Sequence, residues 1–309
     1  MKALRSLPLA LLLVGMGLAL ASCNSKGRDL PMPPTPGDGQ LNKIERIEIT
    51  QSKGGQPVMT IIETFDRAHR RLSLVHDQMK QDGSFGSEIV YQELCEYDAS
   101  GHLIEQKIYD NGATQPPLVT KYSYKRDLLL HEQLFLRGSD QLDYEIEYSY
   151  DQDRISGGTK TVYPGGGASP QQRRLLYSYE GPRVLIKEEI ATTHEIRHAT
   201  ERVTDAQGRL LYEARADYGR LEGQYGLLRR QESRFTYGIL GAPIQKKLEV
   251  YQGAGQTLVS SESSVVTYAT ENLTPEGWPT RAREERTTLV GGKPAIETYS
   301  WTIAYTRFP

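Results

Sequence analysis

Cysteine, phenylalanine and long apolar runs are scarce in this chain of 309 residues, and each scarcity excludes a class of structure. Two cysteines, Cys23 and Cys95, cannot form the disulfide framework of a small secreted domain or a paired-cysteine metal motif. After the N-terminus no segment approaches the roughly 18 consecutive apolar residues of a membrane-spanning helix. A formal net charge of −2 gives no electrostatic reason to expect nucleic acid as a partner.

Tyrosine takes the place of phenylalanine, with 19 residues against 5. Buried aromatic cores usually hold a larger share of phenylalanine, so we expect many tyrosine rings to lie half exposed with their hydroxyl groups in water. Cys95 is expected to be a small buried side chain on a strand rather than a reactive thiol.

The N-terminus has the three parts of a secretory signal. Lys2 and Arg5 precede a mainly apolar run over residues 7–20, and the chain continues Leu20-Ala21-Ser22-Cys23. This ending resembles the lipobox of bacterial lipoproteins, in which the signal peptide is removed before the cysteine and the cysteine is lipidated. The resemblance implies that residues 1–22 are a signal peptide and that acyl chains on Cys23 hold the protein on a membrane.

The next segment, residues 23–41, is the lipidated cysteine followed by a tether that contains four prolines and several glycines. This composition predicts an extended linker between the membrane and a folded part over residues 42–309. The resemblance implies the bacterial outer membrane. Residues 24–26 lack the acidic run that marks surface export in some Bacteroidetes lipoproteins, and the periplasmic and surface sides both stay open.

Aromatic-plus-polar steps recur in the folded part at intervals of 25 to 33 residues. A strand with alternating side chains leads into each step, a short turn follows, and a second strand leaves. An aspartate can bond the turn backbone, and glycine supplies a positive φ angle. The steps are Phe65-Asp66, Tyr97-Asp98, Tyr124-Lys125, Tyr150-Asp151, Tyr179-Glu180, Thr204-Asp205, Tyr237-Gly238 and Tyr268-Ala269.

Two of these steps resemble the YD or RHS repeat family. Tyr97-Asp98-x-x-Gly101-x-Leu103 fits the family pattern Y-D-x-x-G-x-L, and Asp205-x-x-Gly208-Arg209-Leu210 fits it with threonine in place of tyrosine. The degenerate resemblance covers roughly residues 60–270, and the chain is also similar to Tyr-rich Bacteroidetes lipoproteins of unknown function. It implies a meander of antiparallel hairpins. The cleavage and toxin domains of large RHS proteins are missing, so toxin delivery is not implied.

The sequence therefore predicts an all-β protein, an antiparallel meander of repeated hairpins that forms an extended curled sheet or a barrel-like shell. A nonrepetitive all-β domain is the alternative. About 16 to 18 strands would also suit a barrel embedded in the membrane, but that barrel needs an outward apolar band on every strand. Charged residues such as Glu93, Glu145 and Lys187 fall in both alternation classes, which argues against it.

One five-residue string in the chain matches a catalytic motif. His194-Glu195-Ile196-Arg197-His198 matches the H-E-x-x-H motif of zinc peptidases, in which two histidines on one helix face bind zinc and the glutamate is the general base. On a strand the two histidine Cα atoms would stand about 13 Å apart and could not hold one ion. The repeat register predicts a strand over residues 195–204, and no third histidine follows the motif.

From these patterns we expect no metal, no other cofactor and no enzymatic activity. The function predicted is a lipid-anchored cell-envelope scaffold for binding or structure, with a protein or glycan partner on a Tyr-rich face and no nucleic acid. A zinc hydrolase using His194, Glu195 and His198 is the alternative from another class, beside the membrane-embedded barrel. The other four histidines are expected at solvated strand positions: His69, His76, His102 and His131.

Overall fold

A computed structural model describes residues 44–68, 70–79, 87–110, 118–136, 141–166, 168–221, 223–237, 243–271, 273–275, 278–290 and 293–308. The predicted signal peptide, the tether and the lipid attachment residue Cys23 lie outside these residues. No helix occurs in the described part of the chain, and hence none that could cross a membrane.

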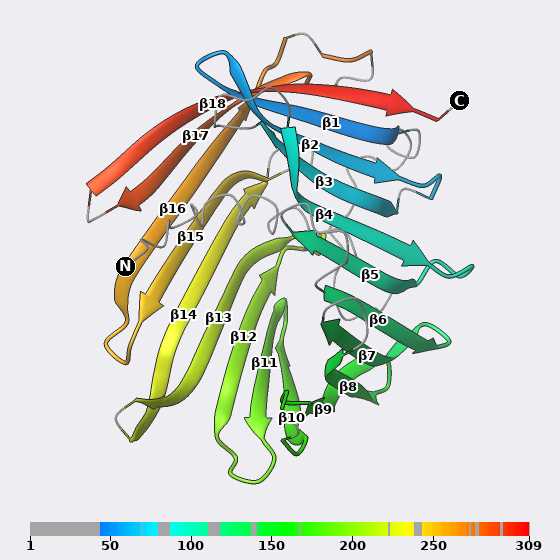
Figure 1. Cartoon of the computed structure of the whole chain (residues 1–309), viewed down its shortest axis with the longest axis vertical. Helices are drawn as coiled ribbons and strands as arrows, with labels where there is room; N and C mark the ends of the chain where they lie inside the picture. The colour runs from blue at the N-terminus through cyan, green and yellow to red at the C-terminus, as the bar shows by residue number, and fades with distance from the viewer. Residues whose placement is uncertain are drawn as a thin grey trace.

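Eighteen strands make up the described structure (Figure 1). In chain order they are β1 (Ile44–Lys53), β2 (Gln56–Phe65), β3 (Arg71–Met79), β4 (Ser87–Tyr97), β5 (Leu103–Asp110), β6 (Leu118–Lys125), β7 (Leu128–Leu136), β8 (Gln141–Asp151), β9 (Arg154–Val162), β10 (Gln171–Glu180), β11 (Arg183–Ile190), β12 (Ile196–Thr204), β13 (Leu210–Leu221), β14 (Gln224–Tyr237), β15 (Pro243–Gln252), β16 (Thr257–Tyr268), β17 (Arg281–Val290) and β18 (Lys293–Arg307).

The strands form one closed up-and-down barrel. Every strand pairs antiparallel with the next one along the chain, and β18 pairs with β1 from Ile44↔Arg307 to Ser52↔Ser300. Figure 1 shows the hairpins following one another around the ring, from β1 in blue to β18 in red. The predicted all-β antiparallel meander is confirmed. Closure pairs both edges of the sheet, so none is left to aggregate.

A β-bulge recurs where the aromatic step meets the returning strand. Tyr97 pairs with Leu103 while Glu96 pairs with Glu105, which leaves Ile104 as the extra residue. A bulge of this kind bends its strand and increases the local twist, which a closing sheet needs. The same register shift stands at Phe65, Tyr124, Tyr150, Thr204 and Tyr237.

The turns after these steps use the chemistry that the sequence predicts. Asp98 accepts hydrogen bonds from the backbone N–H of His102 and, through its main-chain oxygen, from Gly101, whose φ is 90°. The turn at Asp205 has the same arrangement, with Gly208 at φ 78°. Glycine adopts this left-handed backbone without the steric cost that a Cβ brings.

Contacts between strands two apart identify the inner face of the barrel, because side chains converge on the concave side of a curved sheet. Gln51 of β1 reaches Glu284 of β17 at 2.8 Å across β18. Lys160 of β9 reaches Glu188 of β11 at 3.1 Å across β10. Alternation along the paired strands assigns the remaining inward-facing residues.

The outer face carries charges of both signs. Arg234 of β14 pairs with Glu249 of β15 at 2.8 Å, and Arg183 of β11 pairs with Glu201 of β12 at 2.7 Å. These pairs link neighbouring strands along the barrel wall. Further charged residues that alternation places outward include Arg46, Glu48, Glu105, Lys107, Glu145, Glu147, Lys187, Glu189, Lys247, Arg283 and Glu285.

Apolar packing is concentrated on the inner face of β2 and β3. Met59, Ile61 and Leu74 form a cluster in which each side chain is at most 5% exposed. Burial of each contributes about 1.5–3 kcal/mol relative to exposure. Tyr91 packs against the same cluster from β4.

The seam between the first and last strands is joined by one buried carboxylate. Glu284 of β17 is 2% exposed. It accepts hydrogen bonds from Gln51 of β1 at 2.8 Å, Ser264 of β16 at 2.9 Å, Arg286 at 3.0 Å and Trp301 of β18 at 3.2 Å. One side chain therefore links four strands across the point where the barrel closes.

Candidate functional site

Several tyrosines donate their hydroxyl group to a backbone carbonyl that lies 21 to 27 residues earlier in the chain. The hydroxyl of Tyr97 donates to the carbonyl of Arg71 at 3.0 Å, and that of Tyr237 donates to the carbonyl of Leu210 at 2.9 Å. The prediction of tyrosine hydroxyls in water is wrong for these rings, because backbone carbonyls of the inner wall take them up. The same bond joins Tyr150 to Leu129, Tyr179 to Ile155 and Tyr305 to Pro279.

An aspartate and an arginine from the preceding turn complete this contact. Asp205 accepts a 2.6 Å hydrogen bond from Nε of Arg209, and the guanidinium of Arg209 lies 4.9 Å from the ring centre of Tyr237. We call this Asp–Arg–Tyr arrangement the inter-unit clamp. Asp66, Arg70 and Tyr97 form a second clamp, with a 2.7 Å bond and a 4.8 Å stacking distance.

Two tyrosines bind the side chain of Glu132, which lies on β7 at the inner wall. Its carboxylate accepts hydrogen bonds from the hydroxyls of Tyr144 at 2.8 Å and Tyr148 at 2.9 Å. Burial and the neighbouring Glu132 raise the pKa of Tyr144 and of Tyr148 well above the ordinary tyrosine value, so both remain donors.

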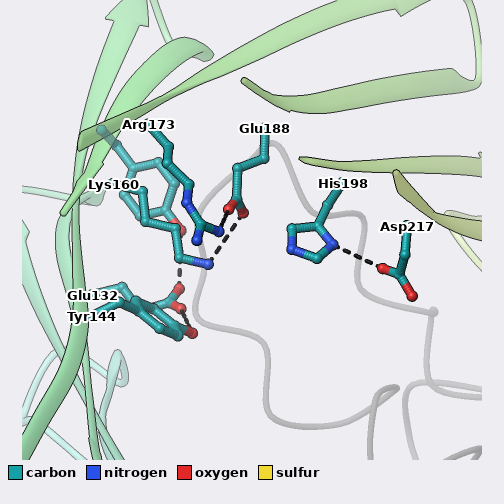
Figure 2. Close-up of polar contacts among 8 residues, drawn as sticks. Glu132, Tyr144, Lys160, Arg173, Glu188, His198 and Asp217 are labelled. Carbon is teal, nitrogen blue, oxygen red and sulfur yellow. Dashed lines mark hydrogen bonds and ion pairs between the residues drawn. The ribbon is translucent and has the colours of Figure 1, made fainter. Parts of the chain in front are cut away.

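Charged groups continue this inner wall over β9 to β11 (Figure 2). Glu188 accepts from Lys160 at 3.1 Å and from Arg173, and the Lys160 ammonium lies 4.2 Å from the ring centre of Tyr144. Burial opposes ionisation of Glu188, but Arg173 and Lys160 outweigh it and hold the pKa of the carboxyl group below its ordinary value. Glu188 therefore stays ionised.

Next to this group lies a histidine–aspartate pair that solvent reaches. His198 Nδ1 of β12 and Asp217 of β13 are 2.8 Å apart, and each side chain is 49% exposed. Figure 2 shows His198 between Glu188 and Asp217. We name Glu132, Tyr144, Lys160, Arg173, Glu188, His198 and Asp217 the inner-wall patch.

The inner-wall patch offers hydrogen-bond donors and acceptors that neighbouring side chains hold in place. In the part of the chain that the structure describes, no group of three or more His, Cys, Asp or Glu side chains is arranged to hold a metal ion. Its half-exposed members, His198 and Asp217, can exchange water for a polar ligand.

The H-E-x-x-H string does not assemble a zinc site. Residues 196–204 form β12, which confirms the predicted strand apart from its first residue. His194 lies in the preceding turn with φ 60° and contacts Glu189 at 2.9 Å, whereas His198 contacts Asp217 on the inner wall. Because Glu189 faces outward, the two histidines make their contacts on opposite faces of the sheet.

The other histidines differ from the prediction of solvated positions. His76 and His102 are 2% and 3% exposed, so the prediction is wrong for both. His131 is exposed on β7 as predicted, and His69 lies outside the described residues. Burial, followed by the charge of Arg71, lowers the pKa of His76 to about 4, so it is neutral at physiological pH. Alternation could have placed His76 beside Leu74 on the inner face.

Cys95 lies on β4 with its side chain turned to the inner face and 8% exposed. This position agrees with the predicted buried side chain. Its neighbour Glu93 is fully buried as well, which the sequence pattern did not indicate.

Comparisons with known proteins give no family. No family model and no curated protein matches the chain. Among solved structures, a porin-like protein from Bacteroides vulgatus ATCC 8482 is 12% identical, covers 76% of this chain and 98% of its own, and has a TM-score of 0.36.

Two further solved structures are similar at the same low level. A porin-like protein from Bacteroides uniformis ATCC 8492 is 12% identical over 85% of this chain and 96% of its own, with a TM-score of 0.30. The structure of TcdB2-TccC3-TEV is 11% identical over 79% of this chain and 16% of its own, with a TM-score of 0.28. No score reaches 0.5, so the fold rests on the strand pairing described above.

Proposed function

We propose that this chain is a lipid-anchored β-barrel scaffold of a bacterial outer membrane whose barrel stands in water. The observation that carries the proposal is the charged outer wall. An arginine or lysine on the lipid face of a membrane barrel costs about 2–4 kcal/mol at the midplane. The outer wall holds many such groups in mid-strand, among them Arg234 and Lys247. Immersion in lipid would oppose folding at each of them.

The place where the chain enters and leaves the barrel supports a tether to the membrane. Ile44 at the start of β1 pairs with Arg307 at the end of β18, so the first strand begins and the last strand ends at the same rim of the barrel. A linker from Cys23 joins the barrel at this rim. The opposite rim, which holds the turns at residues 54–55 and 191–195, then points away from the membrane.

Within the scaffold, the inner-wall patch is the proposed binding surface. A closed barrel admits an extended chain through its rim but excludes a folded protein. Of the two partner classes that the sequence left open, this geometry favours a hydroxyl-rich glycan, which would bond to His198 and Asp217.

Detergent dependence tests the anchoring proposal. A protein that begins after Cys23 is expected to remain in the aqueous phase without detergent and to elute as a folded monodisperse species. The full-length lipoprotein is expected to enter the detergent phase, and Cys23→Ala is expected to return it to water. A barrel that needs detergent even without Cys23 would be embedded in the membrane, and the proposal would fail.

Calorimetric titration with neutral oligosaccharides tests the binding surface. Asp217→Asn removes one charged acceptor and is expected to weaken binding about tenfold, because hydrogen bonds to charged groups are worth about 1.5–3 kcal/mol. The matched control is Glu147→Gln on the outer face of β8, which should leave binding unchanged. Equal losses in both variants, or no binding by the parent, would refute the glycan proposal.

A further inference from the structure

One position of the clamp series carries a histidine where the equivalent turns carry arginine. Asp66 and Asp205 each bond the arginine four residues later, Arg70 and Arg209. In the turn after β4 the fourth residue is His102, and Asp98 bonds both its backbone N–H at 2.8 Å and its Nδ1 at 3.0 Å.

His102 also reaches the next hairpin. Its Nε2 lies 3.1 Å from Oδ1 of Asp127 in the turn between β6 and β7, and its ring stacks on Tyr124 with centres 4.6 Å apart. Two arginines lie at these turns: Arg70 approaches the neighbouring Gly101, and Arg126 precedes Asp127 in the chain. His102 is 3% exposed, so the contacts with Asp98, Asp127 and Tyr124 define its surroundings.

Both ring nitrogens therefore face carboxylate oxygens. An imidazolium donates from both nitrogens, whereas a neutral imidazole has one N–H and presents a lone pair from the other nitrogen. Unlike arginine, histidine ordinarily changes charge between about pH 5 and 8. The two-sided bond is thus available only to the charged form of this clamp.

We propose that His102 is a pH-sensitive joint between the β4–β5 and β6–β7 hairpins, at the rim where the chain ends of the barrel meet. The joint is closed when His102 is charged. When the proton is lost, the contact with Asp127 is the one that breaks, because the Asp127 side chain is 80% exposed and can turn to water. Asp98 keeps its bonds to the turn.

The sign of the effect follows from the groups involved. Both contacts are available to the charged ring, and one is lost together with the proton. The hydrogen bonds from His102 hold the pKa of Asp98 below its ordinary value, so its carboxylate persists at mildly acid pH. The joint therefore tightens toward acid pH and loosens toward alkaline pH.

Hydrogen exchange of the intact lipoprotein at pH 5.5 and pH 8, corrected for intrinsic exchange, tests the joint. Protection of residues 122–130 is expected to fall about 3- to 10-fold at the higher pH, which corresponds to less than one charged hydrogen bond. The clamp of Asp205, Arg209 and Tyr237 is an internal control that should not change.

Two variants separate the joint from a general effect of pH. His102→Arg restores the charged partner of the other clamps and is expected to abolish the pH dependence. Asp127→Asn changes an exposed side chain, keeps the fold and is expected to reduce the difference to less than twofold. An unchanged difference in either variant, or equal protection at both pH values in the parent, would overturn the proposal.

Discussion

Buried ion pairs distinguish the residues of this barrel from those of an ordinary apolar core. Arg71 and Glu93 lie 2.7 Å apart with side chains 0% and 1% exposed, beside the apolar cluster of β2 and β3. Such a pair contributes little net stability over an apolar pair, yet the loss of one partner leaves a buried charge without its counterion. The inner wall therefore tolerates loss of charge poorly.

Glu93→Ala is expected to lower the free energy of unfolding by about 3–5 kcal/mol, because the guanidinium of Arg71 loses its nearest carboxylate. The matched control is Glu48→Ala. Its partner Arg46 lies 2.6 Å away, but the two side chains are 42% and 40% exposed. An exposed pair is worth about 0–1 kcal/mol. Similar urea midpoints for the two variants would contradict the burial of the Arg71–Glu93 pair.

Glu63 gives a pH-dependent prediction at the same place. Burial, partly offset by Arg71, raises the pKa of its carboxyl group above the ordinary value of 4.5. The folded protein then holds this proton more tightly than the unfolded chain. The contribution of Glu63 to stability therefore declines as the pH rises from 4.5 through its folded pKa. Glu63→Gln should flatten that part of the curve of unfolding free energy against pH, and an unaltered curve would contradict the assignment.

At the scale of the strands and turns, local sequence predicts much of what is seen. Alternation and the aspartate–glycine turns predicted the hairpins, and the register predicted a strand after His194. The bulges and the clamp were not predicted, because the partner of each tyrosine is a backbone carbonyl of another hairpin. Because the period is loose, the sequence also does not show that Arg70 and Arg209 are equivalent, although each bonds the aspartate four residues before it.

Strand β9 contains a position where only glycine fits. A Cβ on Gly158 would lie 2.7 Å from the carbonyl oxygen of Glu147. Gly158→Ala is expected to cost about 1–3 kcal/mol of unfolding free energy, because the backbone of β8 or β9 must shift. Gly226→Ala on β14 is the control, since a Cβ there meets nothing within 4 Å. Equal thermal stability of the two variants would contradict the close approach of β8 and β9.

The clamp can be tested by removing one oxygen atom. Tyr237→Phe leaves the carbonyl of Leu210 without the hydroxyl and should cost about 1–3 kcal/mol. Tyr218→Phe is the control, because the ring of Tyr218 stacks on Tyr225 and that contact survives the change. Chemical denaturation measures both. If Tyr237→Phe were as stable as the control, the hydroxyl bond would not be part of the clamp.

At the scale of the whole molecule, closure and the assignment of faces were beyond the sequence. Pairing of β1 with β18 joins residues that lie more than 200 positions apart, such as Gln51 and Trp301. It also brings Gln51 to Glu284 of β17, with a separation of 233. No local pattern reports such a contact. The Tyr-rich face was predicted from alternation, but alternation does not say which face is concave. Only closure shows that this face is the inner wall, where its hydroxyls serve the protein itself.

The most direct test of a lipid-anchored barrel in water is the labelling of its outer wall. Single cysteines at Glu147, Glu285 and Ser300, all exposed in mid-strand, would be treated with a water-soluble maleimide in the lipidated protein reconstituted in liposomes. The unsubstituted protein is the control for Cys95. We predict rapid labelling at all three positions without detergent. Protection of these positions that detergent removes would place the outer wall in lipid and contradict the account.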